Sequence, residues 1–448
     1  MKYSAINIGP IVKTLGLARK PRELWAASFL FSDLMNYIIK EMPGYLEVLS
    51  PARLLTSSAP GLGLYPDRIY VRGEIADDAF QNLVETAWEK FGHDVFSDKD
   101  VRRYFTLMTA SVEVDADHKA IKELNALLDV LELNVTAADT VSTEEVLALI
   151  QKTSDSPLFV HGLGIKSFPV DSLQEIARVS SGDGRVRKSY HNYICVVQAD
   201  GDNVGTYLSG NALKDGELAK VSEALLSFGI KASDVIKDFG GMPVYAGGDD
   251  LLFIAPVVGK DGRSDIFDLL AALESAFSGV SDLIADASLS FGVSMTYYKH
   301  PLYESLQTAR KLLFEKAKKV PGKNAVAWIL QKHSGEQFAA AFSKKTPHLW
   351  DEFANLLANT TDGNTVSAVA HKLREFAPLV ERVVKSNVPS RLDSLFDKVL
   401  EMKNNGFFKA VKSLMPILNG ACPDGYVDTL YALLRTAKFV KGEEPIDE

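Results

Sequence analysis

The chain has 448 residues, of which 46% are hydrophobic and 24% charged, and its formal net charge is −9 at pH 7. This length is too great for a single core and predicts roughly two to four domains, while the negative charge excludes a protein that coats nucleic acid over its whole surface. The two cysteines, Cys195 and Cys422, are too few for a disulfide framework. No signal peptide and no run of membrane-spanning length is found, which predicts a cytoplasmic protein that makes no membrane contact.

Residues 1–134 alternate short apolar runs with amphipathic stretches, as a ferredoxin-like α+β unit does. The predicted strands are 3–12, 66–71 and 103–114, and the predicted helices are 24–40, 77–91 and 120–133. Residues 135–190 are less regular, and the glycines and serines at 180–184 predict a loop. The two cysteines lie too far apart in sequence to build a zinc site in this region.

An apolar run of strand length, residues 193–199, leads directly into Asp200-Gly201-Asp202. A strand that buries both faces reads as continuous apolar residues, and ligands collect where such strands end. Apolar residues at spacings of three and four between 218 and 239 then predict a helix.

A second acidic turn follows this helix. Two apolar runs, 242–246 and 251–255, are separated by Gly247-Gly248-Asp249-Asp250. Because glycine accepts the positive φ of a tight turn, this pattern predicts a β-hairpin with carboxylates at its turn. Packing the intervening helix on the sheet brings both acidic turns to one edge.

Clustered aspartates are unfavourable to bury without a cation, and carboxylate oxygens suit Mg²⁺ or Mn²⁺. We therefore predict a catalytic metal site formed by Asp200, Asp249 and Asp250, with Asp249 as the more direct ligand. Adjacent residues of a strand point to opposite faces, so Asp249 and Asp250 both face Asp200 only if the turn twists them. Three roles therefore stay open for Asp250. It binds a second metal ion, it contacts the metal ligands without binding the metal itself, or it helps to deprotonate the attacking hydroxyl.

The order strand-Asp-Gly-Asp, helix, strand-Gly-Gly-Asp-Asp-strand resembles the palm of nucleotidyl cyclases and GGDEF-type synthases. With the flanking segments Ile8-Gly9-Pro10, 18–28 and 298–303, it resembles the large polymerase/cyclase-like subunit of type III CRISPR effector complexes, closest to the Cmr type. The resemblance covers residues 1–333. It implies an α+β fold with two palm domains, one of them degenerate, and a C-terminal α-helical bundle.

On this resemblance we divide the chain into a degenerate palm (1–134), a connecting domain without a zinc site (135–190), a catalytic palm (191–333) and a helical domain (334–448). Asn7 and Gly9 stand in the first palm where the second has Asp200 and Asp202. Every segment after Ser334 is predicted helical: 336–358, 364–386, 390–403, 406–418 and 425–440. His93-Asp94 spells the dipeptide of HD nucleases without the further histidines of such sites, so no HD nuclease activity is expected.

The resemblance also implies a nucleotide site beside the metal. Its predicted residues are Gly201, Asp202, Asn203, Gly205, Gly247, Gly248, Lys318 and Lys323. Backbone N–H groups from 201 to 205 can hold phosphate oxygens, and the two lysines resemble a basic pair placed against a triphosphate. The alternative for Asp202 is a solvated turn, and for the lysines a solvated basic helix end.

The implied activity is nucleotidyl transfer from ATP, switched on by target RNA, which gives cyclic oligoadenylates or AMP joined to an acceptor such as S-adenosylmethionine. The implied partners are a small helical subunit, backbone subunits, CRISPR RNA and target RNA. Arg185, Arg187 and Lys188 either contact RNA phosphates or form a solvated loop. The rival interpretation is a non-catalytic scaffold of the same ribonucleoprotein, although a scaffold gains nothing from carboxylates that repel one another. A free-standing cyclase is disfavoured by the helical tail.

Overall fold

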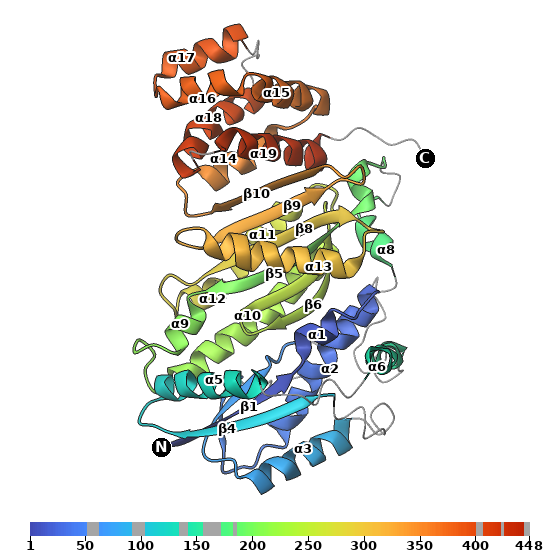
Figure 1. The fold of residues 1–448 in the computed structure, drawn as a ribbon, viewed down its shortest axis with the longest axis vertical. Helices are drawn as coiled ribbons and strands as arrows, with labels where there is room; N and C mark the ends of the chain where they lie inside the picture. The colour runs from blue at the N-terminus through green and yellow to red at the C-terminus, as the bar shows by residue number, and fades with distance from the viewer. Residues whose placement is uncertain are drawn as a thin grey trace.

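A computed structural model describes residues 1–51, 62–91, 104–133, 142–155, 172–181, 186–399, 406–422 and 425–442. The chain forms two β-sheets, which are followed by a group of helices at the C-terminal end (Figure 1). Within the described residues, no helix combines the length and the apolar character that a membrane span requires.

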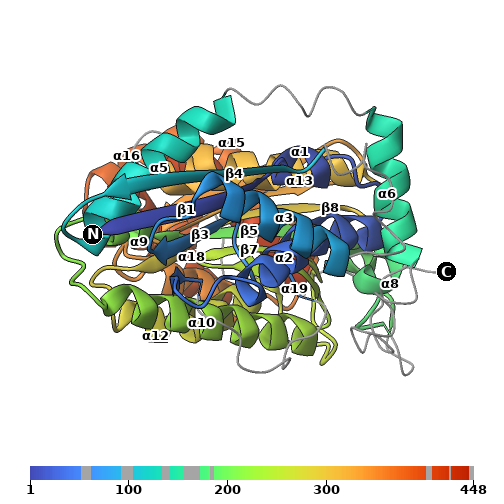
Figure 2. The same ribbon diagram turned by 90° about the horizontal axis from the view of Figure 1, so that it is seen from below.

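The first sheet has four antiparallel strands in the order β2-β3-β1-β4. Its strands are β1 (Lys2–Gly9), β2 (Glu47–Ser50), β3 (Arg68–Arg72) and β4 (Thr106–Glu113). The nearby helices are α1 (Ile11–Leu15), α2 (Pro21–Lys40), α3 (Asp77–Phe91), α5 (Asp117–Leu133) and α6 (Thr143–Asp155). Alternate residues of β1 face opposite sides: Tyr3 and Ala5 pack with α5, which runs beside β1 and β4 in Figure 2, whereas Ile6 and Ile8 pack with α2 and α3.

The second sheet has six strands in the order β10-β9-β8-β5-β7-β6, and only the β8–β9 pair is parallel. Its strands are β5 (Tyr193–Asp202), β6 (Met242–Gly247), β7 (Asp250–Pro256), β8 (Ser288–Tyr297), β9 (Ala325–Gln331) and β10 (Gln337–Ser343). The long helix α10 (Glu217–Phe239) covers one face, and α13 (Leu302–Lys311) packs on β5 and β8. The shorter elements are α8 (Leu173–Ala177), η2 (Ser189–Asn192), α9 (Val204–Leu208), α11 (Ile266–Ala276), α12 (Ser278–Ser281), η3 (Leu312–Lys316) and η4 (Ala317–Lys319).

The two sheets repeat one topology. The order β2-β3-β1-β4 in the first sheet corresponds to β6-β7-β5-β8 in the second, strand for strand. Both central strands, β1 and β5, are paired antiparallel on both sides. The predicted α+β fold with two palm-like units and C-terminal helices is therefore confirmed.

The two units also pack against each other. Helix α2 of the first unit lies on β6, and α10 of the second lies on β2. Leu24 shares a hydrophobic cluster with Val244 and Ile254. The N–H of Ala246 donates to the carbonyl of Gly63 at 2.8 Å, so a segment of the first unit borders the strand that leads to the second acidic turn.

The C-terminal helices are α14 (Leu349–Asn359), α15 (Gly363–Glu375), α16 (Ala377–Lys385), α17 (Pro389–Ser394), η5 (Leu395–Val399), α18 (Gly406–Ala421) and α19 (Tyr426–Lys441). They pack on the outer strands of the second sheet, where the indole N–H of Trp328 donates to Thr436 Oγ1 at 3.1 Å. The helix predicted over 336–358 is wrong in its first part, because residues 337–343 form β10. Their alanines suggested a helix, but Phe338, Ala340 and Phe342 alternate in burial with Gln337, Ala339 and Ala341.

Candidate active site

The two acidic turns meet at one end of the central strand of the second sheet. The β5–β7 pairing runs as far as Ala199 and Leu251, so the next residues, Asp200 and Asp250, are neighbours. A Cβ atom added to Gly201 would stand 2.5 Å from Oδ2 of Asp249. Gly201 is thus a glycine that permits close approach, and the hairpin turn covers the end of β5. The structure brings Asp200 and Asp249 together, as the sequence predicted.

The hairpin turn explains how adjacent aspartates can face the same partner. Gly247 pairs with Asp250, which leaves Gly248 and Asp249 as a two-residue loop, and Gly248 has φ of 67°. Asp249 therefore lies in the turn and Asp250 opens the strand, so the alternation of strand side chains does not separate them. Both carboxyl groups interact with that of Asp200.

The electrostatics of this cluster are those of crowded carboxylates. Burial, followed by the neighbouring charge of Asp200, raises the pKa of Asp249. Burial, followed by the charges of Asp249 and Asp200, raises the pKa of Asp250 well above its ordinary value. When carboxylates stand this close, each disfavours ionisation of the others unless a cation compensates their charges.

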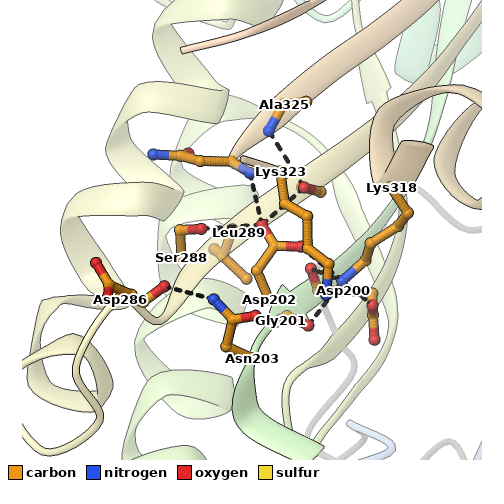
Figure 3. A network of polar contacts seen from close by, with 12 residues as sticks. Asp200, Gly201, Asp202, Asn203, Asp286, Ser288, Leu289, Lys318, Lys323 and Ala325 are labelled. Carbon is orange, nitrogen blue, oxygen red and sulfur yellow. Dashed lines mark hydrogen bonds and ion pairs between the residues drawn. The ribbon is translucent and has the colours of Figure 1, made fainter. Parts of the chain in front are cut away.

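Lys318 supplies part of that compensation. It lies in η4, beyond the end of α13, and its ammonium group forms ion pairs with Asp200 and, at 2.9 Å, with Asp202 Oδ1 (Figure 3). It also donates to the carbonyl oxygens of Asp200 at 3.1 Å and Gly201 at 2.7 Å. Burial opposes its charge, but the two aspartates outweigh burial and raise the pKa of Lys318. The lysine predicted to face a triphosphate thus forms ion pairs with two of the aspartates.

Asp202 differs from the other aspartates because it is fully buried, with 0% of its surface exposed. Its Oδ2 accepts hydrogen bonds from Ser288 Oγ (2.9 Å), Ser290 Oγ (2.8 Å) and the N–H of Asn324 (2.9 Å). A side chain enclosed in this way is not a solvated turn, so that alternative is wrong, whereas the predicted contact of Asp202 with a nucleotide stays a prediction. Asp202 holds Lys318 and the loop before β9 in place.

The remaining predicted nucleotide residues surround this cluster less tightly. Asn203 has φ of 66°, donates to the carbonyl of Asp286 at 3.1 Å and precedes α9, while a Cβ at Gly205 would meet no atom within 4 Å. Lys323 is half-buried, and Figure 3 shows its side chain extending toward the same turn as Lys318. A Cβ at Gly247 would collide with the hydroxyl of Tyr245, 2.3 Å away.

Sequence reasoning missed two residues that border the cluster, Tyr245 and Asp67. Burial and the charges of Asp250, Asp67 and Asp249 together raise the pKa of Tyr245. Asp67 stands directly before β3 of the first sheet, and its charge also acts on Asp250. The period of two along β6 could have placed Tyr245 beside Gly247, whereas no local pattern marks Asp67.

The donor chemistry of the cluster fits a hard divalent cation. Among the described residues, no set of three or more His, Cys, Asp or Glu side chains is arranged to hold a metal ion by itself. Mg²⁺, however, is usually bound by one or two carboxylates together with substrate phosphates and water. Asp200, Asp249 and Asp250 offer such oxygen atoms, and a cation would relieve the repulsion between them.

Comparison with known proteins identifies the domain to which the second sheet is similar. Residues 193–327 match the second palm domain of Cas10/Cmr2, and residues 3–54 match the N-terminal region of the CRISPR-associated protein Cmr2. The resemblance to Cas10/Cmr2 proteins is confirmed. The chain is 34% identical over 174 residues to the CRISPR system Cmr subunit Cmr2 of Pyrococcus furiosus, a match that covers 33% of this chain and 19% of that protein.

Solved structures of Cas10/Cmr2-like subunits share the fold. A Type III-B Cmr-beta complex bound to cognate target RNA aligns with a TM-score of 0.60 and 11% identity, covering 85% of this chain and 76% of that one. A Csm1-Csm4 cassette in complex with pppApA aligns with a TM-score of 0.56 and 14% identity, covering 93% and 69%. His93, Asp94 and Arg185 lie outside the described residues, so the expectations placed on them stay predictions, as do the domain boundaries.

Proposed function

We propose that this chain is a metal-dependent nucleotidyltransferase that uses ATP to make a signalling nucleotide. The observation that carries the proposal is the meeting of Asp200, Asp249 and Asp250 at the end of β5, beside the ammonium group of Lys318. Phosphoryl transfer asks little covalent chemistry of a protein, but it needs compensated phosphate charge and a positioned nucleophile. Clustered carboxylates beside lysines meet both needs.

In this proposal Asp200 and Asp249 hold Mg²⁺ or Mn²⁺, which when bound neutralises charge on the phosphates. Asp250 is a further ligand or accepts the proton of the attacking hydroxyl. Asp202 keeps Lys318 directed at the end of β5. Tyr245 and Asp67 border the same space from β6 and from the first sheet, where the acceptor substrate binds.

The chemistry of the product follows from the fold neighbours only as a class. The Csm1-Csm4 cassette has been solved with pppApA and with cA4, at TM-scores of 0.56 and 0.52 to this chain. By analogy we propose that the 3′-hydroxyl of one ATP attacks the α-phosphate of another and releases pyrophosphate, which leads to cyclic oligoadenylates. S-adenosylmethionine, joined to AMP, is the second candidate acceptor.

The proposed setting is a type III CRISPR ribonucleoprotein in the cytoplasm. One Cmr-beta neighbour was solved with cognate target RNA, and the Csm1 neighbours were solved with Csm4. We extend this to the present chain as a proposal: it assembles with a small helical subunit, backbone subunits and CRISPR RNA, and target RNA switches on synthesis.

The proposal is tested by mass spectrometry of reaction products. The assembled complex is incubated with ATP, Mg²⁺ or Mn²⁺ and target RNA, with and without S-adenosylmethionine. We expect an oligoadenylate series or a single adenylylated acceptor, formed only when target RNA is present. If no nucleotide product forms in any of these reactions, the proposal is wrong.

A scaffold without activity is the second candidate, and one observation favours it. Lys318 already pairs with Asp200 and Asp202, as an internal cation would in a palm that needs no metal. The scaffold predicts that Asp249→Ala/Asp250→Ala changes assembly, whereas the enzyme predicts intact assembly and lost product. Size-exclusion chromatography and product analysis of the same preparation separate the two.

A further inference from the structure

The far end of the second sheet carries a second feature, remote from the aspartates. Strand β5 runs from Tyr193 to Asp202, so at about 3.3 Å per residue its two ends lie about 30 Å apart. Figure 1 shows α9, which follows the acidic end, on the opposite side of the sheet from α8. At the Tyr193 end, two cavities of about 290 and 310 Å³ adjoin each other at the β9–β10 turn and share Lys332 and His333.

Most of the charged side chains that line these cavities are basic. Lys332, Arg435 and Lys438 line the first cavity, and Lys299 and His300 line the second together with Lys332. The lining residues include one carboxylate, Glu336, which stands 3.6 Å from Arg435. The chain as a whole has a net charge of −9, so this concentration of cations runs against its composition.

Aromatic rings are interleaved with these cations. The rings of Tyr297 and exposed His333 have their centroids 4.8 Å apart and are tilted by 34° to each other. Lys299 stands over the ring of Tyr298 at 5.7 Å, and Lys332 stands over that of Phe439 at 4.0 Å. Exposed rings beside cations, such as that of His333, are what bind unpaired bases in single-stranded nucleic acid, whereas the Phe439 ring is fully buried and only packs against the stem of Lys332.

The turn that carries His333 is held in a fixed shape. The N–H of Lys332 donates to the carbonyl of Glu336 at 2.8 Å, and the N–H of Gly335 donates back to Lys332 at 2.9 Å. The N–H of His333 donates to the hydroxyl of Tyr193 at 2.9 Å. A rigid turn costs little conformational entropy when it binds a ligand.

The basic loop singled out in the sequence joins this end of the sheet. Arg187 donates to Asn192 Oδ1 at 3.2 Å, and the carbonyl of Asn192 accepts from the N–H of Tyr298 at 2.9 Å. Arg178 stands over the ring of Tyr298 at 5.9 Å. The cations therefore continue from the two cavities toward the segment before β5.

We propose that the two cavities around the β9–β10 turn form a binding site for single-stranded RNA, with a base stacked on His333 and phosphates held by Lys299, Lys332 and Arg435. Both cavities are open to solvent, and each lies at the lower end of the range for ligand pockets. An open pair of this size suits two successive nucleotides of a chain that passes across the turn. The site extends beyond the proposed nucleotidyl transfer and does not depend on it.

The test is fluorescence anisotropy of a short labelled single-stranded RNA with the full chain, at several salt concentrations. Lys299→Met/Lys332→Met removes two cations, and Met at 332 keeps an unbranched stem over Phe439. The matched control is Lys220→Met/Lys231→Met, two exposed lysines of α10. We expect the Kd to rise about tenfold for the first pair only, and the salt slope to fall in magnitude by about 1.4.

A second arm examines stacking. His333→Ala should weaken binding of base-bearing RNA by about tenfold and leave binding of an abasic ribose-phosphate strand unchanged. Equal RNA affinity and salt slope in the Lys299/Lys332 pair and its control would overturn the proposal. So would intact RNA affinity with lost co-purification of other effector subunits, because the surface would then bind protein. Product formation by the same variants is measured separately, because it tests the proposed nucleotidyl transfer at the aspartates and not RNA binding.

Discussion

Four strands of the second sheet repeat the strand order of the first sheet, but the charges at the end of the central strand are reversed. In the second sheet, Asp200 on β5 pairs with Lys318, which follows the helix after β8. In the first sheet, Asn7 occupies the corresponding place on β1, and its Nδ2 donates to Glu132 of α5, the helix after β4, at 2.6 Å. The carboxylate has become a carboxamide and the cation a carboxylate.

This difference shows how one fold can carry a cluster of carboxylates in one copy and no such cluster in the other. A neutral Asn7 beside Glu132 offers no cluster that needs a cation. Arg68, the cation that pairs opposite Asn7 in this sheet, forms ion pairs with Asp129 at 2.6 Å and with Glu132 at 3.2 Å and so is already neutralised. What the first sheet retains is Asp67, directly before β3, whose charge raises the pKa of Tyr245 and of Asp250 in the second sheet.

The largest expected effect comes from a substitution in the hairpin turn of the second sheet. We expect Asp249→Asn to reduce nucleotide product by about 10³-fold, because it removes a ligand for the cation that compensates the phosphates. Its melting temperature should not fall, since one of several repelling carboxylates is lost. Asp67→Asn in the first sheet is the matched change, with an expected loss of less than about tenfold. Equal losses in both variants would contradict the division of labour between the sheets.

Substitution of a glycine beside Asp249, compared with a control glycine, tests whether Asp249 acts from its observed position. Gly201→Ala places a methyl group 2.5 Å from Asp249 Oδ2 and must displace that carboxylate. We expect about 10²-fold less product, measured at saturating ATP, with normal folding by circular dichroism. Gly279→Ala in α12, whose methyl group meets no atom within 4 Å, serves as the control. If both variants remain fully active, Asp249 does not act from its observed position.

Loss of the internal cation tests stability rather than rate. Lys318→Met leaves the buried Asp202 without its ion pair, although its bonds from Ser288, Ser290 and Asn324 remain. We expect the free energy of unfolding, from urea denaturation, to fall by about 2 kcal/mol. Lys319→Met, at an exposed neighbouring position, should leave it unchanged. Asn7→Ala, the counterpart in the first sheet, should cost about 1 kcal/mol.

The smallest expected effect concerns pH and the segment that enters the second sheet. Burial, and the nearby charges of Arg187, Lys188 and Arg178, lower the pKa of His191 from 6.5 to about 4. The unfolded chain thus binds a proton more readily, so stability is full above pH 6.5 and is lost as pH falls toward 4. From this residue we expect a loss of about 1.5 kcal/mol between about pH 7 and 5.

Denaturation midpoints at a series of pH values measure this loss. His191→Gln should flatten the profile between these pH values, whereas His371→Gln, at an exposed position of α15, should not. An unchanged slope in the His191 variant would show that another group carries the pH dependence.

Much of the second sheet could be predicted from the sequence because its signals are local. The apolar run before Asp200 and the glycines before Asp249 each specify a strand end or a turn within a few residues. The boundaries of α3 are those predicted, 77–91.

What could not be predicted depends on partners distant in the chain. Asp202 is buried because Ser288, Ser290 and Asn324 donate hydrogen bonds to its carboxylate. Lys318 binds carboxylates that lie more than a hundred residues earlier in the chain. Strand β10 was missed because alanine favours a helix, whereas the open edge of β9 supplied a ladder of hydrogen bonds.

The most direct test of the central claim, that Asp200 and Asp249 share one cation beside a bound nucleotide, is Mn²⁺ binding measured by electron paramagnetic resonance with a non-hydrolysable ATP analogue present. The account predicts nucleotide-dependent Mn²⁺ binding by the unmodified chain, and at least about tenfold weaker binding by Asp200→Asn and by Asp249→Asn alike. Mn²⁺ binding that is unchanged in either variant would contradict it.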